Sequence, residues 1–265
     1  MNLSSVNLIY FSPTGTSKKI VKAIGQELSI QQINEFDITP LSFASSGNFK
    51  IENELSIIAI PVYGGRVPDL ALEHLKKFEV KDTPVVLLAV YGNRHFDDAL
   101  LELKDAVLEI GFTPFAAAAF IGEHSFSIES KPIAINRPDE ADLLKAKQFA
   151  EELLLKIQDG EANGFQVCEV PGNVPYKAKG KMPDIAPITE EEHCDLCGVC
   201  ADVCPVDVIA VNDTVETNVE SCIRCCACIK ACPANARVFN NQLIDGIRER
   251  LFTNCSERRE PEFFI

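Results

Sequence analysis

Residues 194–205 read CDLCGVCADVCP, and residues 222–233 read CIRCCACIKACP. The two stretches match at a constant offset of 28 residues, in four cysteines and a final proline each. Five restrictive positions that agree at one offset indicate an internal duplication. Because a unit of this length is too short to bury a core alone, we expect the two copies to pack around whatever their cysteines bind.

The cysteine spacing in each copy is C-x2-C-x2-C-x3-C-P. Zinc sites usually close at four ligands from two C-x2-C pairs, whereas this spacing suits the corners of a [4Fe–4S] cubane. In this motif the fourth cysteine of a copy ligates the other cluster. The sequence therefore predicts two clusters with crossed ligands, one held by Cys194, Cys197, Cys200 and Cys232 and the other by Cys222, Cys225, Cys228 and Cys204. A double zinc site or disulfides are the alternatives.

Over residues 189–240 this pattern resembles the bacterial two-cluster ferredoxins. The resemblance implies a small α+β domain whose function is one-electron transfer. Three cysteines stand outside the motif. We expect Cys226 to be a packed thiol, with an alternative role as a ligand of a damaged cluster, and Cys168 and Cys255 to be structural, with a reactive thiol as the alternative.

The cysteines also divide the chain, because none of the 11 precedes residue 168. We expect a domain at 1–160, a linker at 161–183, a cysteine domain at 184–245 and a C-terminal tail at 246–265. Residues 1–160 and 184–240 each carry a net charge of −7, so the cysteine domain is far more densely acidic. The linker is rich in glycine and proline and contains Lys177, Lys179 and Lys181.

The composition of the whole chain excludes several classes of protein. With 265 residues, 46% hydrophobic and 24% charged, it is typical of globular proteins rather than disordered ones. No apolar run approaches the roughly 20 residues of a membrane span, and residues 1–5 show no signal peptide. The net charge of −14 argues against binding to nucleic acid. We therefore expect a soluble, cytoplasmic protein whose thiols bind metal.

The first 160 residues alternate short apolar runs with helical periodicity. The predicted strands are 6–11, 33–38, 55–61, 85–91 and 115–121, and helices are predicted from about residue 18 and over 69–78, 97–110 and 139–157. Apolar strands that alternate with helices predict an α/β fold with a parallel, doubly wound sheet of five strands. Ligands of such sheets bind beyond the carboxyl ends of the strands.

A loop of hydroxyl residues joins the first predicted strand to the first helix, at residues 12–17, SPTGTS. Backbone N–H groups and a helix N-terminus at one point make an anion site, most often for phosphate. The loop lacks the glycine–lysine pattern of a P-loop, so ATP and GTP are poor candidates. The predicted phosphate-binding residues are Ser12, Thr14, Gly15, Thr16 and Ser17.

Two further loops, after the third and fourth predicted strands, join glycines to aromatic residues that suit a flat ring. The predicted ring contacts are Tyr63, Gly64, Gly65, Tyr91, Gly92, Asn93, Arg94 and Phe96. Together with the hydroxyl loop, they give residues 3–157 a resemblance to the flavodoxins, which implies that the domain binds FMN. The chain has no tryptophan to stack on the ring, so tyrosine or phenylalanine would have to serve.

Some nearby polar residues are candidates for the same site. Arg66 and Arg94 are expected either to offset the charge of a reduced flavin or to be surface charges. His124 and Ser125 could line the same rim, although a lone histidine is more often structural.

The combination predicts an electron-transfer protein that passes electrons between FMN, two [4Fe–4S] clusters and redox partners with basic patches. The architecture resembles flavodoxin-like domains fused to a C-terminal two-cluster ferredoxin. A flavin-dependent reductase that uses NAD(P)H or a small organic acceptor is one alternative, although no dinucleotide fingerprint is present. An iron–sulfur redox sensor is the other.

Overall fold

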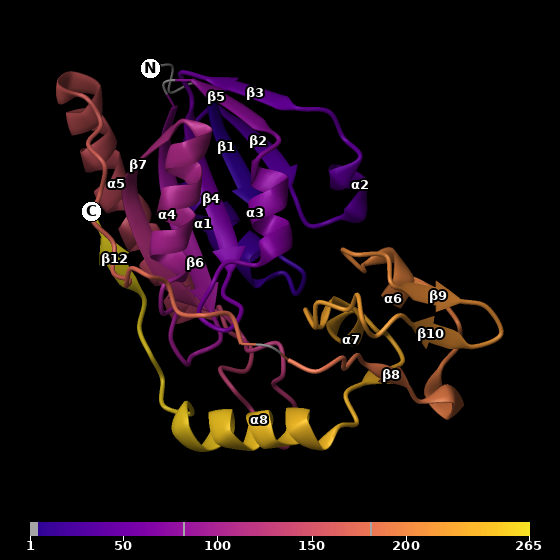
Figure 1. The fold of residues 1–265 in the computed structure, drawn as a ribbon. Helices are drawn as coiled ribbons and strands as arrows, with labels where there is room; N and C mark the ends of the chain where they lie inside the picture. Colours follow the sequence, from indigo (N-terminus) through magenta and orange to yellow (C-terminus); the bar gives the residue numbers. More distant parts are fainter. Residues whose placement is uncertain (1–4, 82, 181) are drawn as a thin grey trace.

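A six-stranded sheet lies at the centre of the N-terminal lobe of the computed structural model, which describes residues 5–81, 83–180 and 182–265 (Figure 1). The strand order is β12-β7-β6-β4-β1-β2. The strands are β1 (Ser5–Tyr10), β2 (Gln32–Asp37), β4 (Leu55–Pro61), β6 (Thr83–Tyr91), β7 (Phe112–Ile121) and β12 (Glu262–Phe264). All but β12 run parallel, which confirms the predicted α/β class.

The position of β1 within the sheet decides where a ligand would bind. It pairs with β2 on one side and with β4 on the other, so that Leu8 lies opposite both Glu35 and Ile57. The five parallel strands therefore have the order of flavodoxin-like sheets, in which the chain changes direction beside the first strand. The switch point lies between β1 and β4, at the carboxyl ends of the strands.

Helices cover both faces of the sheet. These are α1 (Thr16–Glu27), α3 (Asp69–Leu75), α4 (Ala99–Ile110) and α5 (Glu140–Asn163). Ile20 and Phe149 belong to a core that α1 and α5 form on one face, and Leu75 and Leu103 belong to a core that α3 and α4 form on the other. Strands buried on both faces must be apolar throughout, which explains their continuous apolar runs.

The sequence patterns do not predict several short elements of this lobe. They are α2 (Leu41–Ala44) and a separate parallel pair, β3 (Phe49–Glu52) and β5 (Phe78–Lys81). The rings of Phe36, Phe43, Phe49 and Phe78 pack together here, with centroids about 5–6 Å apart. Strands of four residues are too short to show a period.

The C-terminal segment returns to the N-terminal lobe, which the predicted tail did not anticipate. Strand β12 adds to the edge of β7 in antiparallel register, with Phe263 opposite Ala118. Phe263 packs on Phe149 on one face of the sheet, and Phe264 packs on Phe96 on the other. The sheet therefore has six strands rather than five.

Ion pairs hold the same segment near the start of α5. Arg258 lies 2.6 Å from Asp139, the N-cap residue, and 3.3 Å from Asp142. The hydrogen bond from Arg258 holds the pKa of Asp139 well below its usual value. Asn93 donates from its side chain to the backbone carbonyls of Cys255 and Glu257, at 2.6 and 2.8 Å.

The linker packs along the N-terminal lobe and makes hydrogen bonds with it. Cys168 N donates to Pro114 O at 2.8 Å, and the Asp98 carboxylate accepts from the backbone of Asn173 and Lys177. Lys179 pairs with Asp69, while Lys181 lies outside the described residues. The boundaries of the linker stay a prediction.

The cysteine lobe, residues 188–239, is built of short elements. They are β8 (Ile188–Thr189), the 3-10 helix Glu191–His193, α6 (Val199–Asp202), β9 (Ile209–Val211), β10 (Val215–Thr217), α7 (Ala227–Lys230) and β11 (Arg237–Val238), and the longer α8 (Gln242–Asn254) follows. Strand β8 pairs with β11, and β9 pairs with β10. Helix α8 crosses the predicted boundary at residue 245.

The duplication is visible in the backbone of this lobe. Three pairs of residues 28 positions apart have matching positive φ angles: Leu196 (55°) and Arg224 (57°), Gly198 (82°) and Cys226 (64°), and Asp207 (50°) and Asn235 (53°). Gly198 and Cys226 are the N-cap residues of α6 and α7. Cys226 therefore takes the place of a left-handed glycine cap, which explains why it disturbs no ligand position.

Within the described ranges, no helix has both the length and the apolar composition that crossing a membrane requires.

Candidate functional site

The eight motif cysteines form two groups in space. Cys194, Cys197, Cys200 and Cys232 line one cavity. Cys204, Cys222, Cys225 and Cys228 line a second cavity, together with Cys226. We refer to these groups, without Cys226, as the first and second thiol sets. Each set takes three cysteines from one copy of the repeat and the fourth from the other copy.

The geometry of both sets suits an object larger than one ion. Among the described residues, no three histidine, cysteine, aspartate or glutamate side chains come close enough to share a single metal ion. A cubane is bound differently, because each thiolate takes its own iron atom. The thiol donors and their arrangement, with four around each cavity, therefore fit [4Fe–4S] clusters.

Burial sets the protonation of these thiols. Desolvation raises the pKa of Cys225 to about 12 and also raises the pKa of Cys200, Cys222 and Cys228. In the absence of metal these four thiols are neutral at physiological pH, and metal coordination is what deprotonates such groups.

A buried arginine lies between the two sets. Arg237 is 2% exposed and donates to Thr189 Oγ1, Pro187 O and Thr217 Oγ1 at 2.7–3.0 Å. Its guanidinium also lies 3.9 Å from Cys228 Sγ, and the residue lines the cavity of the first set. One guanidinium thus supplies positive charge to both sets, and hydrogen bonds to cluster sulfurs are a known control of reduction potential.

The hydroxyl loop between β1 and α1 forms the turn that its sequence predicts. Gly15 adopts a φ of 82°, and an added Cβ there would meet no atom within 4 Å. Ser12 accepts from Gly15 N through its carbonyl and from Lys18 N through its hydroxyl, at 3.1 and 3.0 Å. Ser12 therefore shapes the loop, while the first-turn N–H groups of α1 have no acceptor within the helix.

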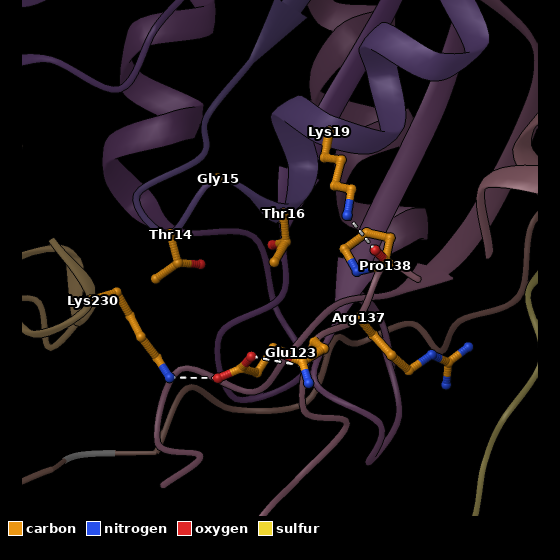
Figure 2. A pocket seen from close by; sticks show the side chains of 9 residues that line it. Thr14, Gly15, Thr16, Lys19, Glu123, Arg137, Pro138 and Lys230 are labelled. Carbon is orange, nitrogen blue, oxygen red and sulfur yellow. Dashed lines mark hydrogen bonds and ion pairs between the residues drawn. The ribbon is translucent and has the colours of Figure 1, made fainter. Parts of the chain in front are cut away.

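Thr14, Gly15 and Thr16 line a cavity of about 260 Å³, which we call the anion cavity (Figure 2). Its other lining residues are Lys19, Glu123, Asn136, Arg137, Pro138 and Lys230. Ser17 is fully buried beside this loop and does not line the cavity, and among the described residues its hydroxyl has no hydrogen-bond partner. An open glycine turn, free hydroxyls and an orphaned buried oxygen fit the phosphate end of a bound cofactor.

The residues predicted to contact the flavin ring lie apart from the anion cavity. Tyr91 and Phe96 are 2% and 1% exposed, their rings lie 5.6 Å apart, and both belong to the core under α3 and α4. The Asn93 amide holds the C-terminal segment. Within the part of the chain that the structure describes, no predicted ring contact lines the anion cavity. The side chains of these three residues make core and tail contacts, although the buried hydroxyl of Tyr91 has no hydrogen-bond partner among the described residues. Their contact with a flavin ring stays a prediction.

The two candidate arginines have carboxylate partners. Arg66 pairs with buried Glu102 at 2.7 Å, and its ring contact is Tyr176, 4.7 Å away. Arg94 pairs with Asp97 at 2.6 Å. Both guanidinium groups are thus held by ion pairs, and their predicted role toward a flavin stays a prediction. Tyr63, Gly64, Gly65 and Arg66 instead form a tight turn, closed by two backbone hydrogen bonds between Tyr63 and Arg66.

His124 lies at the carboxyl edge of the sheet, directly over Gly92, where a Cβ would meet its ring. Burial, with the nearby charges of Arg94 and Lys230, lowers the pKa of His124 to about 4. Its Nδ1 accepts from Phe126 N at 3.0 Å, so the proton of the neutral ring is on Nε2.

This shift predicts a pH dependence. Unfolded His124 takes up a proton below pH 6.5, whereas folded His124 resists until about pH 4, so the stabilisation is complete above pH 6.5 and is lost as the pH falls toward 4. Between pH 6.5 and pH 4 we expect the free energy of unfolding of His124→Asn to fall by about 2 kcal/mol less than that of the wild type. Denaturation under anaerobic conditions at each pH would measure both. The control is His95→Asn, because His95 makes the same bond to Asp97 N from an exposed position. Equal slopes for the wild type and His124→Asn would contradict the prediction.

The cysteine lobe lies beyond the carboxyl ends of the strands, with α7 nearest to them (Figure 1). Ile223, next to Cys222, packs against the core under α3 and α4, and Phe126 packs on Phe239 at 5.6 Å. Burial raises the pKa of Tyr63 well above its usual value, and the thiols of Cys225 and Cys226 add to the shift. The strand-end loops and the second set are therefore neighbours.

Several residues of this site carry no sequence signal. Lys230 and Glu123 form an ion pair at 2.5 Å between the lobes, 107 positions apart in the chain. Asn136, Arg137 and Pro138 come from the irregular loop between β7 and α5. Nothing in their local sequence distinguishes them from surface residues.

Comparisons with known proteins agree with this division. Residues 186–233 match the model of the 4Fe-4S dicluster domain family, which confirms the prediction of two [4Fe–4S] clusters. No curated protein matches the sequence.

The solved structures that resemble the chain cover its N-terminal part. A flavodoxin from Streptococcus pneumonia TIGR4 shares 18% identity, over 57% of this chain and 99% of its own, with a TM-score of 0.39. A flavodoxin from Archaea shares 12%, over 58% and 99%, with a TM-score of 0.38. The rubredoxin oxygen:oxidoreductase of Desulfovibrio gigas shares 12%, over 60% and 37%, with a TM-score of 0.42. At these TM-scores the fold assignment rests on the strand order itself.

Proposed function

We propose that the protein transfers electrons between an FMN bound at the carboxyl edge of its sheet and two [4Fe–4S] clusters bound by its cysteine lobe. The observation that carries this proposal is the packing of the loop of residues 222–228 on the same sheet edge that bears the hydroxyl loop. A flavin exchanges one or two electrons and each cluster exchanges one, so their proximity makes a converter between the two kinds of donor.

The proposed cluster ligands are the two thiol sets. Their arrangement around two cavities supports crossed ligation, because each cavity is lined by three cysteines of one copy and the last cysteine of the other. Arg237 supplies positive charge next to both.

The proposed flavin is FMN, with its phosphate in the anion cavity. Sheets of this strand order bind FMN at the switch point beside the first strand, which is where Thr14, Gly15 and Thr16 lie. FMN has one phosphate, and the hydroxyl loop offers a cradle for it. For the ring, we propose the neighbourhood of the Tyr63–Arg66 turn, because Tyr63 lies between the strand ends and the second thiol set.

Contacts between the lobes fix the distance that electrons must cross. Ile223 and the Phe126–Phe239 pair are apolar, and Lys230 donates to Glu123 and to Ser127 O across the boundary. These groups hold the second set next to the strand ends, so we propose that it exchanges electrons with the flavin first.

The first thiol set faces outward and is the proposed exit toward partners. Cys197 is exposed, and exposed acidic side chains surround this part of the chain: Glu190, Glu191, Glu192, Asp195 and Asp202. An acidic surface attracts basic ones, so we propose redox partners with basic patches. A cytoplasmic location is part of the same proposal, since reduced thiols persist there.

Salt dependence tests this arrangement. In anaerobic stopped-flow or flash reduction, electron exchange between flavin and clusters within one chain should hardly change with ionic strength, because the lobe contacts fix the distance. Electron transfer to a cationic cytochrome should slow several-fold from 50 to 500 mM salt, because encounter is steered.

The outcomes separate the parts of the proposal. If reduced flavin never reduces the clusters, the electron-transfer function fails. If the external rate is flat in salt, only the proposed basic partner fails. An internal rate that collapses with salt would contradict the fixed lobe arrangement.

A further inference from the structure

The anion cavity is built by both lobes (Figure 2). The hydroxyl loop and the loop after β7 form its N-terminal side. On the opposite side, α7 of the cysteine lobe contributes Lys230, whose side chain extends toward Glu123 at the rim.

The charges that line this cavity favour an anion. Lys19, Arg137 and Lys230 line it, with Glu123 as the carboxylate among its lining residues. Arg137 has a buried partner in Asp142 just outside, and Lys19 donates to Pro138 O at 2.6 Å without an ion-pair partner in the described ranges. A cavity with excess positive charge is unexpected in a chain with a net charge of −14.

Lys230 is placed beside the carboxylate of Glu123, which lies at the rim of the cavity. This carboxylate accepts from Lys230 Nζ at 2.5 Å and from Asn136 N at 3.0 Å, so it is fixed at the rim. An unpaired carboxylate there would repel a phosphate. Lys230 neutralises it and adds a donor within reach of the cavity.

We propose that Lys230 is a binding residue for the phosphate of the FMN, supplied to the flavin site by the cysteine lobe. This inference rests on the proposed function, and it adds a consequence. Because one cofactor then contacts both lobes, FMN binding and lobe docking are coupled, and each stabilises the other by the same free energy.

Affinity measurements test the first part. FMN is titrated by fluorescence quenching, under anaerobic conditions and without phosphate buffer, into cluster-loaded protein freed of flavin. Lys230→Ala should weaken FMN binding about 10-fold or more, the effect of one charge-assisted hydrogen bond and one exposed repulsive carboxylate. Riboflavin, which lacks the phosphate, should bind the wild type and Lys230→Ala equally.

Two further variants separate local from general effects. Lys147→Ala also removes one lysine from an ion pair, with Glu27 at 3.3 Å on the surface of α5, and should leave FMN affinity unchanged. Glu123→Gln combined with Lys230→Ala should recover part of the lost affinity, because it removes the repulsion. Iron content must stay constant throughout.

Hydrogen exchange tests the coupling. FMN should slow amide exchange in α7 (Ala227–Lys230) of the wild type, and should slow it much less in Lys230→Ala. This readout does not depend on electron transfer.

Each outcome decides one point. If Lys230→Ala binds FMN as tightly as the wild type, or if riboflavin loses as much affinity as FMN, the role of Lys230 is wrong while the proposed function stands. If FMN does not change the rate of amide exchange in α7, the proposed coupling is wrong. If the wild type binds no FMN, the proposed function itself fails, and this inference with it.

Discussion

Replacing Cys204 with alanine should remove the cluster that Cys222, Cys225 and Cys228 bind, although Cys204 follows the other three-cysteine loop in sequence. Cys204 lines the cavity of the second set, and Cys232 lines that of the first. Iron should fall from about eight to about four atoms per chain, because a cubane that loses a ligand is readily lost. Iron analysis and the electron paramagnetic resonance of the reduced protein would measure this.

Paired substitutions decide between crossed and uncrossed ligation. With crossed ligands, Cys204→Ala with Cys222→Ala damages one cluster and leaves about four irons, whereas Cys204→Ala with Cys194→Ala damages both. Uncrossed ligation reverses these two results.

The control for these variants is Cys226→Gly, which should keep all eight irons. Cys226 has a left-handed conformation at the position where the first copy has Gly198, so glycine relieves backbone strain there. Loss of a cluster in this variant would show that Cys226 is a ligand after all.

Removing two hydroxyls of the hydroxyl loop, by Thr14→Ala with Ser17→Ala, should weaken FMN binding about 100-fold and leave the iron content alone. Each hydroxyl offers one hydrogen bond to a charged phosphate, which contributes about 1.5 kcal/mol or more. Titration with FMN would measure the loss.

The stability of the flavin-free protein distinguishes a ligand contact from a structural role. Ser17 Oγ is buried and has no partner in the part of the chain that the structure describes, so Ser17→Ala removes an unsatisfied group and should not destabilise that state. A matched control is Ser42→Ala with Ser45→Ala, two exposed serines at α2. If Thr14→Ala with Ser17→Ala binds FMN normally, the phosphate assignment is wrong; if Ser17→Ala unfolds the flavin-free protein, its hydroxyl is structural.

Local sequence predicted those parts of the site that lie on one short segment. The cysteine spacing specifies how thiols can surround a cluster, because three ligands within seven residues have little conformational freedom. The turn of the hydroxyl loop is also predictable from local sequence, since a strand, a turn glycine and a helix start are adjacent in the chain; its binding of phosphate stays a prediction. Ser12 and Ser17 do not line the cavity: the Ser12 hydroxyl accepts from Lys18 N, and Ser17 is buried beside the loop.

For the predicted ring contacts, residue type and position in the sequence are not enough to predict what the side chains contact. Tyr91, Asn93 and Phe96 have residue types suited to a flavin, and their loop lies at the expected edge of the sheet. Their side chains are used by the core and by the C-terminal segment, which arrives more than 150 residues later in the chain. A residue's type indicates what it can bind, but competition among distant neighbours decides what it does bind.

Local sequence patterns are enough to predict the class of the chain: a parallel α/β sheet with a loop suited to an anion, followed by two copies of a cluster motif. These features follow from periodicity and ligand spacing, which act over a few residues. Three other features depend on tertiary packing: the second thiol set lies at the carboxyl edge of the sheet, β12 extends the sheet, and Lys230 reaches the anion cavity. These are contacts between segments about 100 residues or more apart. They depend on how complete surfaces pack, which a pattern of a few neighbouring residues does not specify.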